Sequence, residues 1–267
     1  MAELFFNRDD RLVVINRNTH PQLADHVVKD APVIPVAYVI EWFTRVAQPQ
    51  LGSSQTVELS DVKVLNGVVA NGFNNDISLE LRIVISNEKN QSTRLEIVDQ
   101  SGRRRYNCCA ARLAPDDRSR TELSGPATEL PEIYNNDGVL FHGLAFQVLQ
   151  DVRLHAGAGL TASVAGVIDK NWLAEDWITD PALIDGALQL ALLWSKHVLG
   201  RASLPTSIAL VRILDRPRAG ILDATLTGQS ATTSKVICDV VITDDNGTVI
   251  AILDGVETHA LPESDAY

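Results

Sequence analysis

The chain has 267 residues, 45% of them hydrophobic, which is enough to bury a sizeable core in one large domain or two closely joined halves. Its net charge of -11 disfavours binding to nucleic acid or to anionic lipid. The N-terminal "MAELFFNRDD" carries charges where a secretory signal is apolar, and no stretch is long enough to span a bilayer. We therefore expect a cytoplasmic protein that contacts neither nucleic acid nor a membrane.

The three cysteines are Cys108, Cys109 and Cys238, an odd number without the paired spacing of a zinc site. This pattern favours reduced thiols that fill apolar space. The cysteines therefore give no indication of a zinc site.

The first half of the chain predicts one helix followed by strands. The stretch "PVAYVIEWFTRVA" from Pro35 repeats apolar residues at helical spacing. The segments "VELSDVKVL" and "ISLELRIVIS" alternate in the manner of strands, and "IVDQSGRRRYNCCAARL" predicts a hairpin that turns at Gly102. The turn-rich stretch that follows contains the predicted linker, residues 126–137, between an N-terminal unit (1–125) and a C-terminal unit (138–267).

The second half repeats the same order of elements. A helix pattern, "PALIDGALQLALLW", begins at Pro181, and strand patterns then lead to a hairpin at Gly247. The two prolines lie 146 residues apart (181 − 35), and the two turn glycines lie 145 apart (247 − 102). The sequence therefore predicts an α+β fold of two tandem units, each with a central helix wrapped by a bent antiparallel sheet. Sheets joined edge to edge would leave a cleft between the helices.

Each unit contributes one titratable group to that predicted cleft. His26 precedes the first helix, and Asp185 lies within the second, among apolar neighbours that would raise the pKa of its carboxyl group. A neutral imidazole and a protonated carboxyl group suit acid/base catalysis. Gln189, one helical turn after Asp185, can hydrogen-bond to it. A structural histidine and a plain buried polar pair are the alternatives.

These residues resemble the motifs of a known family. "HPQLADHVVKDAPVIP" resembles the H-x-x-x-G-x-x-x-x-P motif of dehydratase domains in polyketide and polyunsaturated fatty acid synthases, with His26 and Pro35 at its ends. "DPALIDGALQ" is similar to their D-x-x-x-Q/H motif and places Asp185 and Gln189. "GVLFHGLAFQ" and "LPTSI" resemble two further motifs, which assign a substrate tunnel to Phe141, His142, Gly143, Phe146, Leu204 and Pro205.

The resemblance implies a double-hotdog architecture and a reaction. A 3-hydroxyacyl thioester, carried on the phosphopantetheine of acyl carrier protein, would lose water to give a trans-2-enoyl thioester. His26 would take the α-proton, Asp185 would protonate the leaving hydroxyl, and N–H groups at the start of the first helix would polarise the thioester carbonyl. The implied reaction requires no metal and no dissociable cofactor. Acyl carrier protein and other synthase domains are the implied partners, with homodimerisation a further expectation.

Two departures from the motifs bear on activity. Asp30 replaces the motif glycine, and we interpret it as a cap of the first helix. Phe141, His142 and Leu144 stand near positions where the family has tyrosine and proline. The alternatives are thus a degenerate dehydratase kept as a scaffold, which Asp30 favours, and a product-template-like cyclase, which a large chamber would favour. Arg103, Arg104 and Arg105 form the predicted docking site for the carrier.

Overall fold

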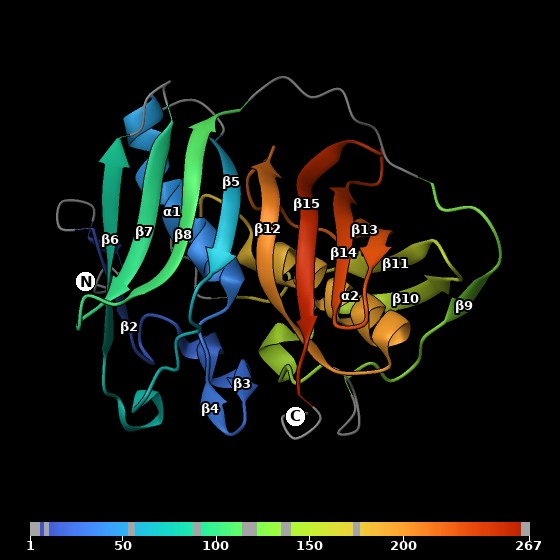
Figure 1. Ribbon diagram of the computed structural model, residues 1–267, viewed down its shortest axis with the longest axis horizontal. Helices are drawn as coiled ribbons and strands as arrows, with labels where there is room; N and C mark the ends of the chain where they lie inside the picture. The colour runs from blue at the N-terminus through green and yellow to red at the C-terminus, as the bar shows by residue number, and fades with distance from the viewer. Residues whose placement is uncertain are drawn as a thin grey trace.

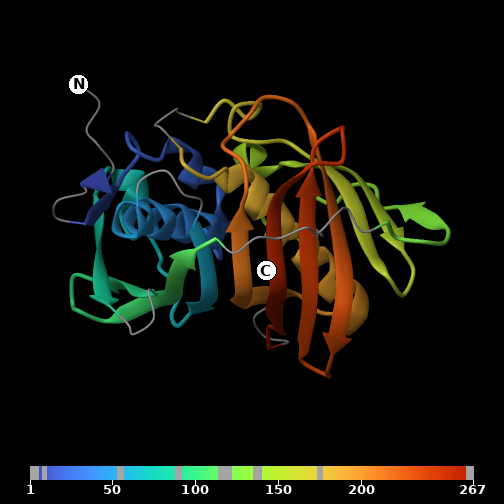
Figure 2. The ribbon, with the colours of Figure 1, turned by 90° about the horizontal axis from the view of Figure 1, so that it is seen from above.

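The computed structural model describes residues 6–7, 11–52, 57–87, 92–113, 122–134, 140–172 and 177–262. Its main feature is a 13-stranded antiparallel sheet that curves past two helices (Figures 1 and 2). The predicted α+β class is confirmed. In sheet order the strands are β1 (Phe6–Asn7), β2 (Leu12–Ile15), β6 (Leu79–Asn87), β7 (Thr93–Asp99), β8 (Arg104–Arg112), β5 (Val57–Val64), β12 (Ser203–Ile213), β15 (Val249–Ala260), β14 (Lys235–Thr243), β13 (Leu222–Ala231), β11 (Gly159–Val164), β10 (Leu149–His155) and β9 (Ala127–Glu129).

The first helix, α1 (Val36–Leu51), begins directly after Pro35, as its sequence predicts. Every residue from Ala37 to Ala47 is buried, because α1 packs on β5, β7 and β8 on one side and on the second helix on another. A helix that is buried on nearly all faces needs such wrapping. The helix ends at Gly52, whose φ of 99° suits glycine.

The second helix, α2 (Pro181–Leu199), is buried continuously from Pro181 to Ser195. Strands β11 to β15 surround it. Asp180 caps its N-terminus by accepting hydrogen bonds from the N–H groups of Ala182 and Leu183, and Gly200 ends it in the left-handed conformation. The two predicted hairpins join β7 to β8 through Gly102 and β14 to β15 through Gly247, both with φ of 79°.

The two halves meet edge to edge where β5 pairs with β12 in antiparallel register, from Ser207 opposite Lys63 to Arg212 opposite Glu58. This seam makes one continuous sheet, and it sets α1 and α2 side by side on its concave face (Figures 1 and 2). The site predicted between the helices therefore has a rigid support.

A buried carboxylate also ties the halves together. Glu41 on α1 accepts hydrogen bonds from the N–H of Ile178 (3.1 Å) and from the N–H and hydroxyl of Thr179 (2.7 and 2.6 Å), and it forms an ion pair with Arg45. Glu41 is fully buried. These bonds fix the segment that leads into α2, and thereby the position of Asp185 relative to α1.

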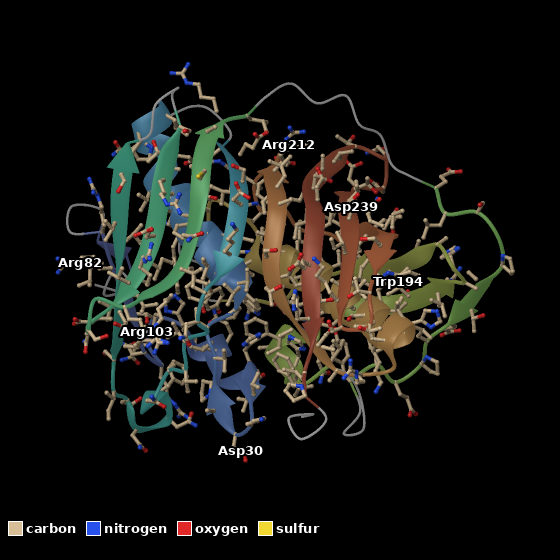
Figure 3. The ribbon with its side chains drawn as sticks, in the orientation of Figure 1. Asp30, Arg82, Arg103, Trp194, Arg212 and Asp239 are labelled. Carbon is tan, nitrogen blue, oxygen red and sulfur yellow. The ribbon has the colours of Figure 1, made fainter. Side chains whose placement is uncertain are left out.

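The prediction that Asp30 caps the first helix is wrong. Asp30 lies in the turn of a small hairpin, β3 (Val27–Val28) and β4 (Ala31–Pro32), six residues before α1 begins at Val36. Its φ of 63° is left-handed, a conformation that aspartate tolerates better than most residues. The side chain is exposed at the edge of the molecule (Figure 3).

The predicted linker, residues 126–137, includes β9, which pairs with β10 at the far edge of the sheet. Residues 135–137 lie outside the described residues, and the domain limits stay a prediction. All three cysteines are free thiols, and Cys108 and Cys238 are buried. In the described part of the chain, neither helix is both long and apolar enough to cross a bilayer.

Candidate active site

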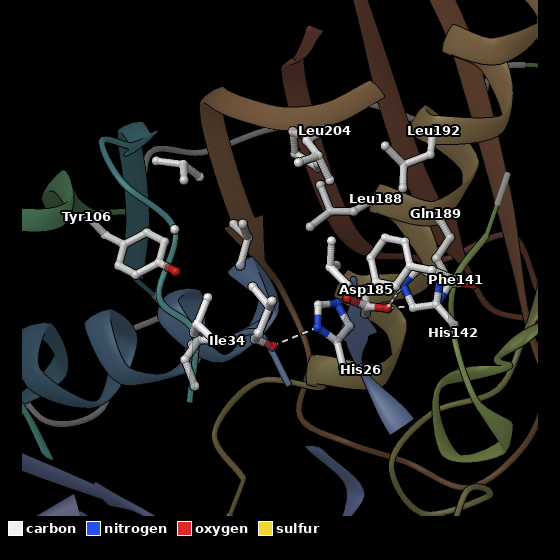
Figure 4. A pocket seen from close by; sticks show the side chains of 17 residues that line it. His26, Ile34, Tyr106, Phe141, His142, Asp185, Leu188, Gln189, Leu192 and Leu204 are labelled. Atoms are coloured by element: carbon white, nitrogen blue, oxygen red, sulfur yellow. Dashed lines mark hydrogen bonds and ion pairs between the residues drawn. The ribbon is translucent and has the colours of Figure 1, made fainter. Parts of the chain in front are cut away.

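The β3–β4 hairpin positions His26. A short 3₁₀ turn (Pro21–Asp25) ends at His26, and the hairpin then returns the chain so that the N–H of Val33 donates to the carbonyl of His26 (3.0 Å). The imidazole of His26 makes a second bond to Val33, because its Nδ1 lies 2.7 Å from the carbonyl oxygen of that residue (Figure 4). A carbonyl can only accept, so Nδ1 carries the hydrogen and Nε2 keeps its lone pair. The turn that includes Asp30 thus orients the ring.

Asp25 makes hydrogen bonds from the segment before His26 to the segment "GVLFHGLAFQ" of the second half. Its backbone carbonyl accepts from the N–H of Gly143 (2.7 Å), and its Oδ2 accepts from the N–H of Ala145 (2.7 Å). A Cβ on residue 143 would come within 2.8 Å of the Asp25 side chain, which explains the glycine. His26 and His142 form a β-bridge beside this contact, with ring centroids 5.3 Å apart.

Asp185 lies in the second turn of α2, and one of its oxygens is held in place. Gln189, four residues later, donates from Nε2 to Oδ2 of Asp185 (2.7 Å) and to the carbonyl of Phe146 (2.8 Å). The hydroxyl of Tyr134 donates to Oε1 of Gln189 (2.6 Å). Nε2 of His142 lies 3.5 Å from the same Oδ2 of Asp185. The carboxyl group therefore has a fixed orientation.

Burial sets the protonation states of these groups. Loss of solvation lowers the pKa of His26 to about 4, opposed in part by its hydrogen bond to Val33. It raises the pKa of Asp185 to about 7, although the Gln189 hydrogen bond acts in the other direction. Burial, and then His26, lowers the pKa of His142 well below its ordinary value. The His142–Asp185 contact therefore joins two neutral groups near pH 6 and is not an ion pair.

These side chains face an apolar cavity of about 260 Å³ between α1, α2 and the β3–β4 hairpin (Figure 4). His26, Asp185 and Gln189 line it together with four of the predicted tunnel residues, Phe141, His142, Leu204 and Pro205. Gly143 and Phe146 are not among the residues that line the cavity. The ring of Phe146 packs against His26, with the two ring centroids 5.0 Å apart. Pro35 is buried between two lining residues, Ile34 and Val36, and Asp30 does not line the cavity.

Three of the lining groups could act as metal ligands. One atom each from His26, His142 and Asp185 lies within 4.8 Å of the other two. A tetrahedral ion with bonds of about 2.0 Å needs ligand atoms roughly 3.3 Å apart, and Nε2 of His142 lies 3.5 Å from Oδ2 of Asp185. Nδ1 of His26 is already committed to Val33.

Sequence reasoning missed three functional neighbours of the pair. The carbonyl of Val33 and the carboxylate of Asp25 act through folded-back loops, and Tyr134 lies 55 residues from Gln189 in the chain. No local pattern marks such contacts. The one feature of the sequence that could have pointed to such a contact is the position of Asp25 next to His26.

The comparisons with known proteins agree on one family. Residues 116–266 match a family described as polyketide synthase dehydratase N-terminal domain, and residues 12–100 match one described as polyketide synthase dehydratase domain. The chain is 24% identical over 215 residues to a polyunsaturated fatty acid synthase polypeptide from Thraustochytrium sp. (strain ATCC 26185 / S-3). That match covers 73% of this chain but only 7% of the relative, so the chain spans a small part of its length.

Solved structures share the fold. The dehydratase domain of RzxB from Pseudomonas fluorescens superposes with a TM-score of 0.75 at 17% identity, covering 95% of this chain and 96% of that one. An inactive mutant of the CurJ dehydratase, in which a histidine is replaced by phenylalanine, gives a TM-score of 0.78 at 16% identity over 94% and 90%. With both halves matched to its sequence families, the chain belongs to the polyketide synthase dehydratase family.

Proposed function

We propose that this domain removes water from a 3-hydroxyacyl thioester on acyl carrier protein to give a trans-2-enoyl thioester, with His26 as general base and Asp185 as general acid. The observation that carries the proposal is that His26 and Asp185 share one cavity in the protonation states that a base and an acid require. Near pH 6, His26 with a pKa of about 4 is a neutral base, and Asp185 with a pKa of about 7 is still protonated.

The geometry suggests how the step would run. Nε2 of His26 takes the proton from the α-carbon, the Cβ–O bond breaks, and Asp185 gives its proton to the departing hydroxyl, which leaves as water. Oδ2 of Asp185 already accepts from Gln189, so we assign the transferred proton to Oδ1. The first N–H groups of α1, where Val36 lines the cavity, would polarise the thioester carbonyl.

The alternatives receive less support. Asp30 was the reason for a scaffold role, and its exposed carboxylate in the hairpin turn does not oppose charge on a thioester oxygen. A cyclase needs room for a long folded chain, whereas this cavity has about 260 Å³. The double-hotdog interpretation is supported by the repeated helix and strands of the two halves and by the solved dehydratase domains, which superpose over 94% and 95% of this chain.

Carrier docking is proposed at the arginines of the β7–β8 hairpin. Arg104 and Arg105 form ion pairs with Glu96 (3.3 Å) and Asp99 (2.6 Å). Arg105 also lies beside the cavity, since its Nη1 is 3.5 Å from the carbonyl of Gly67, a lining residue. Arg103 is exposed. Binding of fluorescent carrier to Arg103→Glu, compared with Arg153→Glu on β10, tests the site, and equal affinity for both variants would contradict it.

The test of the reaction is mass-spectrometric turnover of a short 3-hydroxyacyl pantetheine thioester and its carrier-bound form, in both directions. We expect His26→Ala and Asp185→Asn to lower the rate at least about 100-fold. His155→Ala is the matched control, because His155 lies on β10 outside the cavity and contacts Thr161. An inert wild type with both substrates, or full activity in His26→Ala, would overturn the assignment.

A further inference from the structure

Tyr134 lies outside every motif discussed above, yet its hydroxyl group reaches the active-site hydrogen bonds. It donates to Oε1 of Gln189 (2.6 Å) and accepts from the N–H of Leu149 (2.9 Å). Burial, and more weakly the charge of Asp185, raises the pKa of the phenol, so the hydroxyl keeps its proton. Because the N–H of Leu149 can only donate, the hydroxyl hydrogen is directed to Gln189.

The direction of this bond decides how the amide of Gln189 is oriented. Both hydrogens on Nε2 are used, one toward Oδ2 of Asp185 and one toward the carbonyl of Phe146. Oε1 is the remaining polar atom of a side chain that is 1% exposed. Without a donor on Oε1 the amide would hold a buried, unpaired oxygen.

We propose that Tyr134 is a positioning residue that acts on Asp185 through Gln189. Its hydroxyl group holds the amide with the N–H toward the carboxyl group and polarises that N–H, as hydrogen bonds in series do. The inference rests on the proposed function only in that Asp185 acts as the general acid. The hydrogen bonds from Leu149 through Tyr134 and Gln189 to Asp185 do not depend on that function.

The proposal predicts a titration change. The Gln189 hydrogen bond lowers the pKa of Asp185 by stabilising the carboxylate. Tyr134→Phe keeps the ring but removes the donor, so the bond from Gln189 weakens and Asp185 holds its proton to higher pH. The alkaline limb of kcat moves to higher pH, and kcat at its optimum falls roughly two- to tenfold, with KM little changed.

The experiment is a pH titration of the Asp185 carboxyl carbon by NMR in protein labelled with ¹³C-aspartate, the signal being assigned by its loss in Asp185→Asn. We expect a higher midpoint in Tyr134→Phe than in wild type. Ile133→Val, which removes one methylene beside Tyr134 and leaves the hydrogen bonds intact, is the control and is expected to keep the wild-type midpoint.

A double-mutant cycle separates positioning from general loosening. In a Gln189→Ala background, Tyr134→Phe is expected to cause no further shift. An unchanged midpoint in Tyr134→Phe, or the same shift with and without Gln189, would overturn the proposal. Because the titration needs no turnover, a shifted midpoint in a protein that dehydrates no substrate would reject the proposed function and keep the role of Tyr134.

Discussion

His26, which lines the cavity, donates from Nδ1 to the carbonyl oxygen of Val33, 2.7 Å away, and so keeps the lone pair of its neutral ring on Nε2. The bond closes the loop from His26 to Val33, two residues seven positions apart that the β3–β4 hairpin brings together. A histidine held in this way needs no carboxylate partner to select its tautomer.

The pH profile of kcat/KM follows from the two titrations. His26 must be neutral, so the rate falls as the pH drops through about 4, and Asp185 must be protonated, so the rate falls as the pH rises through about 7. We expect a bell-shaped plot of kcat/KM against pH with its maximum between these values, and initial rates measured from pH 3.5 to 9 check it. A plateau that extends to pH 9 would contradict Asp185 as the acid.

Asp185 also affects stability. Its pKa is about 7 in the folded protein against 3.8 for the ordinary group, so the fold binds the proton more tightly and stability falls as the pH rises between those values. Above pH 7 the buried carboxylate costs up to about 4 kcal/mol on this scale. Asp185→Asn is therefore expected to raise Tm at pH 8 and to change it little at pH 4, as calorimetry can measure. An equal change at both pH values would count against burial as the cause.

Asp30→Gly tests the departure from the family motif. Glycine adopts a φ of 63° without the strain that an L side chain carries, so we expect the unfolding free energy to rise by about 0.5 to 1 kcal/mol. Turnover is expected to stay at the wild-type level, because the carboxylate is exposed and does not line the cavity. Asp30→Ala, which removes the charge but keeps the strain, should show no such gain in urea unfolding.

Glu41 offers a test of the tie between the halves. Glu41→Ala leaves Arg45 buried without this partner and removes the acceptor for the N–H groups of Ile178 and Thr179, so we expect a loss of about 3 to 5 kcal/mol. Glu58→Ala is the control, since its pair with Arg212 at the seam is partly exposed and is worth less than about 1 kcal/mol. If urea unfolding shows similar losses of unfolding free energy for the two variants, Glu41 does not contribute more to stability than an ordinary ion pair at the seam.

The repeat in the sequence predicted more of the fold than any single motif did. Helices that begin at Pro35 and Pro181 and hairpins that turn at Gly102 and Gly247 depend on local spacing, and the structure has all four. The capping role of Asp30 was wrong because aspartate favours helix starts and left-handed turns alike. Nothing nearby in the sequence decides between them.

The candidate site was predictable only in part. His26 and Asp185 could be paired because each unit supplied one titratable residue near its helix, and the structure brings both to one cavity. The hydrogen bonds of Val33, Asp25 and Tyr134 depend on how distant backbone segments meet. Such contacts arise from tertiary packing, which residue spacing does not encode.

The tandem arrangement lets the two halves specialise. Applying the spacing of the helix-opening prolines (181 − 35), Trp172 is the counterpart of His26, and Val39 is the counterpart of Asp185. Trp172 donates from its indole N–H to the carbonyl of Ala145 and packs against Phe146, while Val39 is fully buried. Two identical chains would repeat both polar groups at both positions. In a single chain each polar group occurs once, and the counterpart positions hold apolar side chains that pack around the cavity residues, as Trp172 does through Phe146, whose ring lies against that of His26.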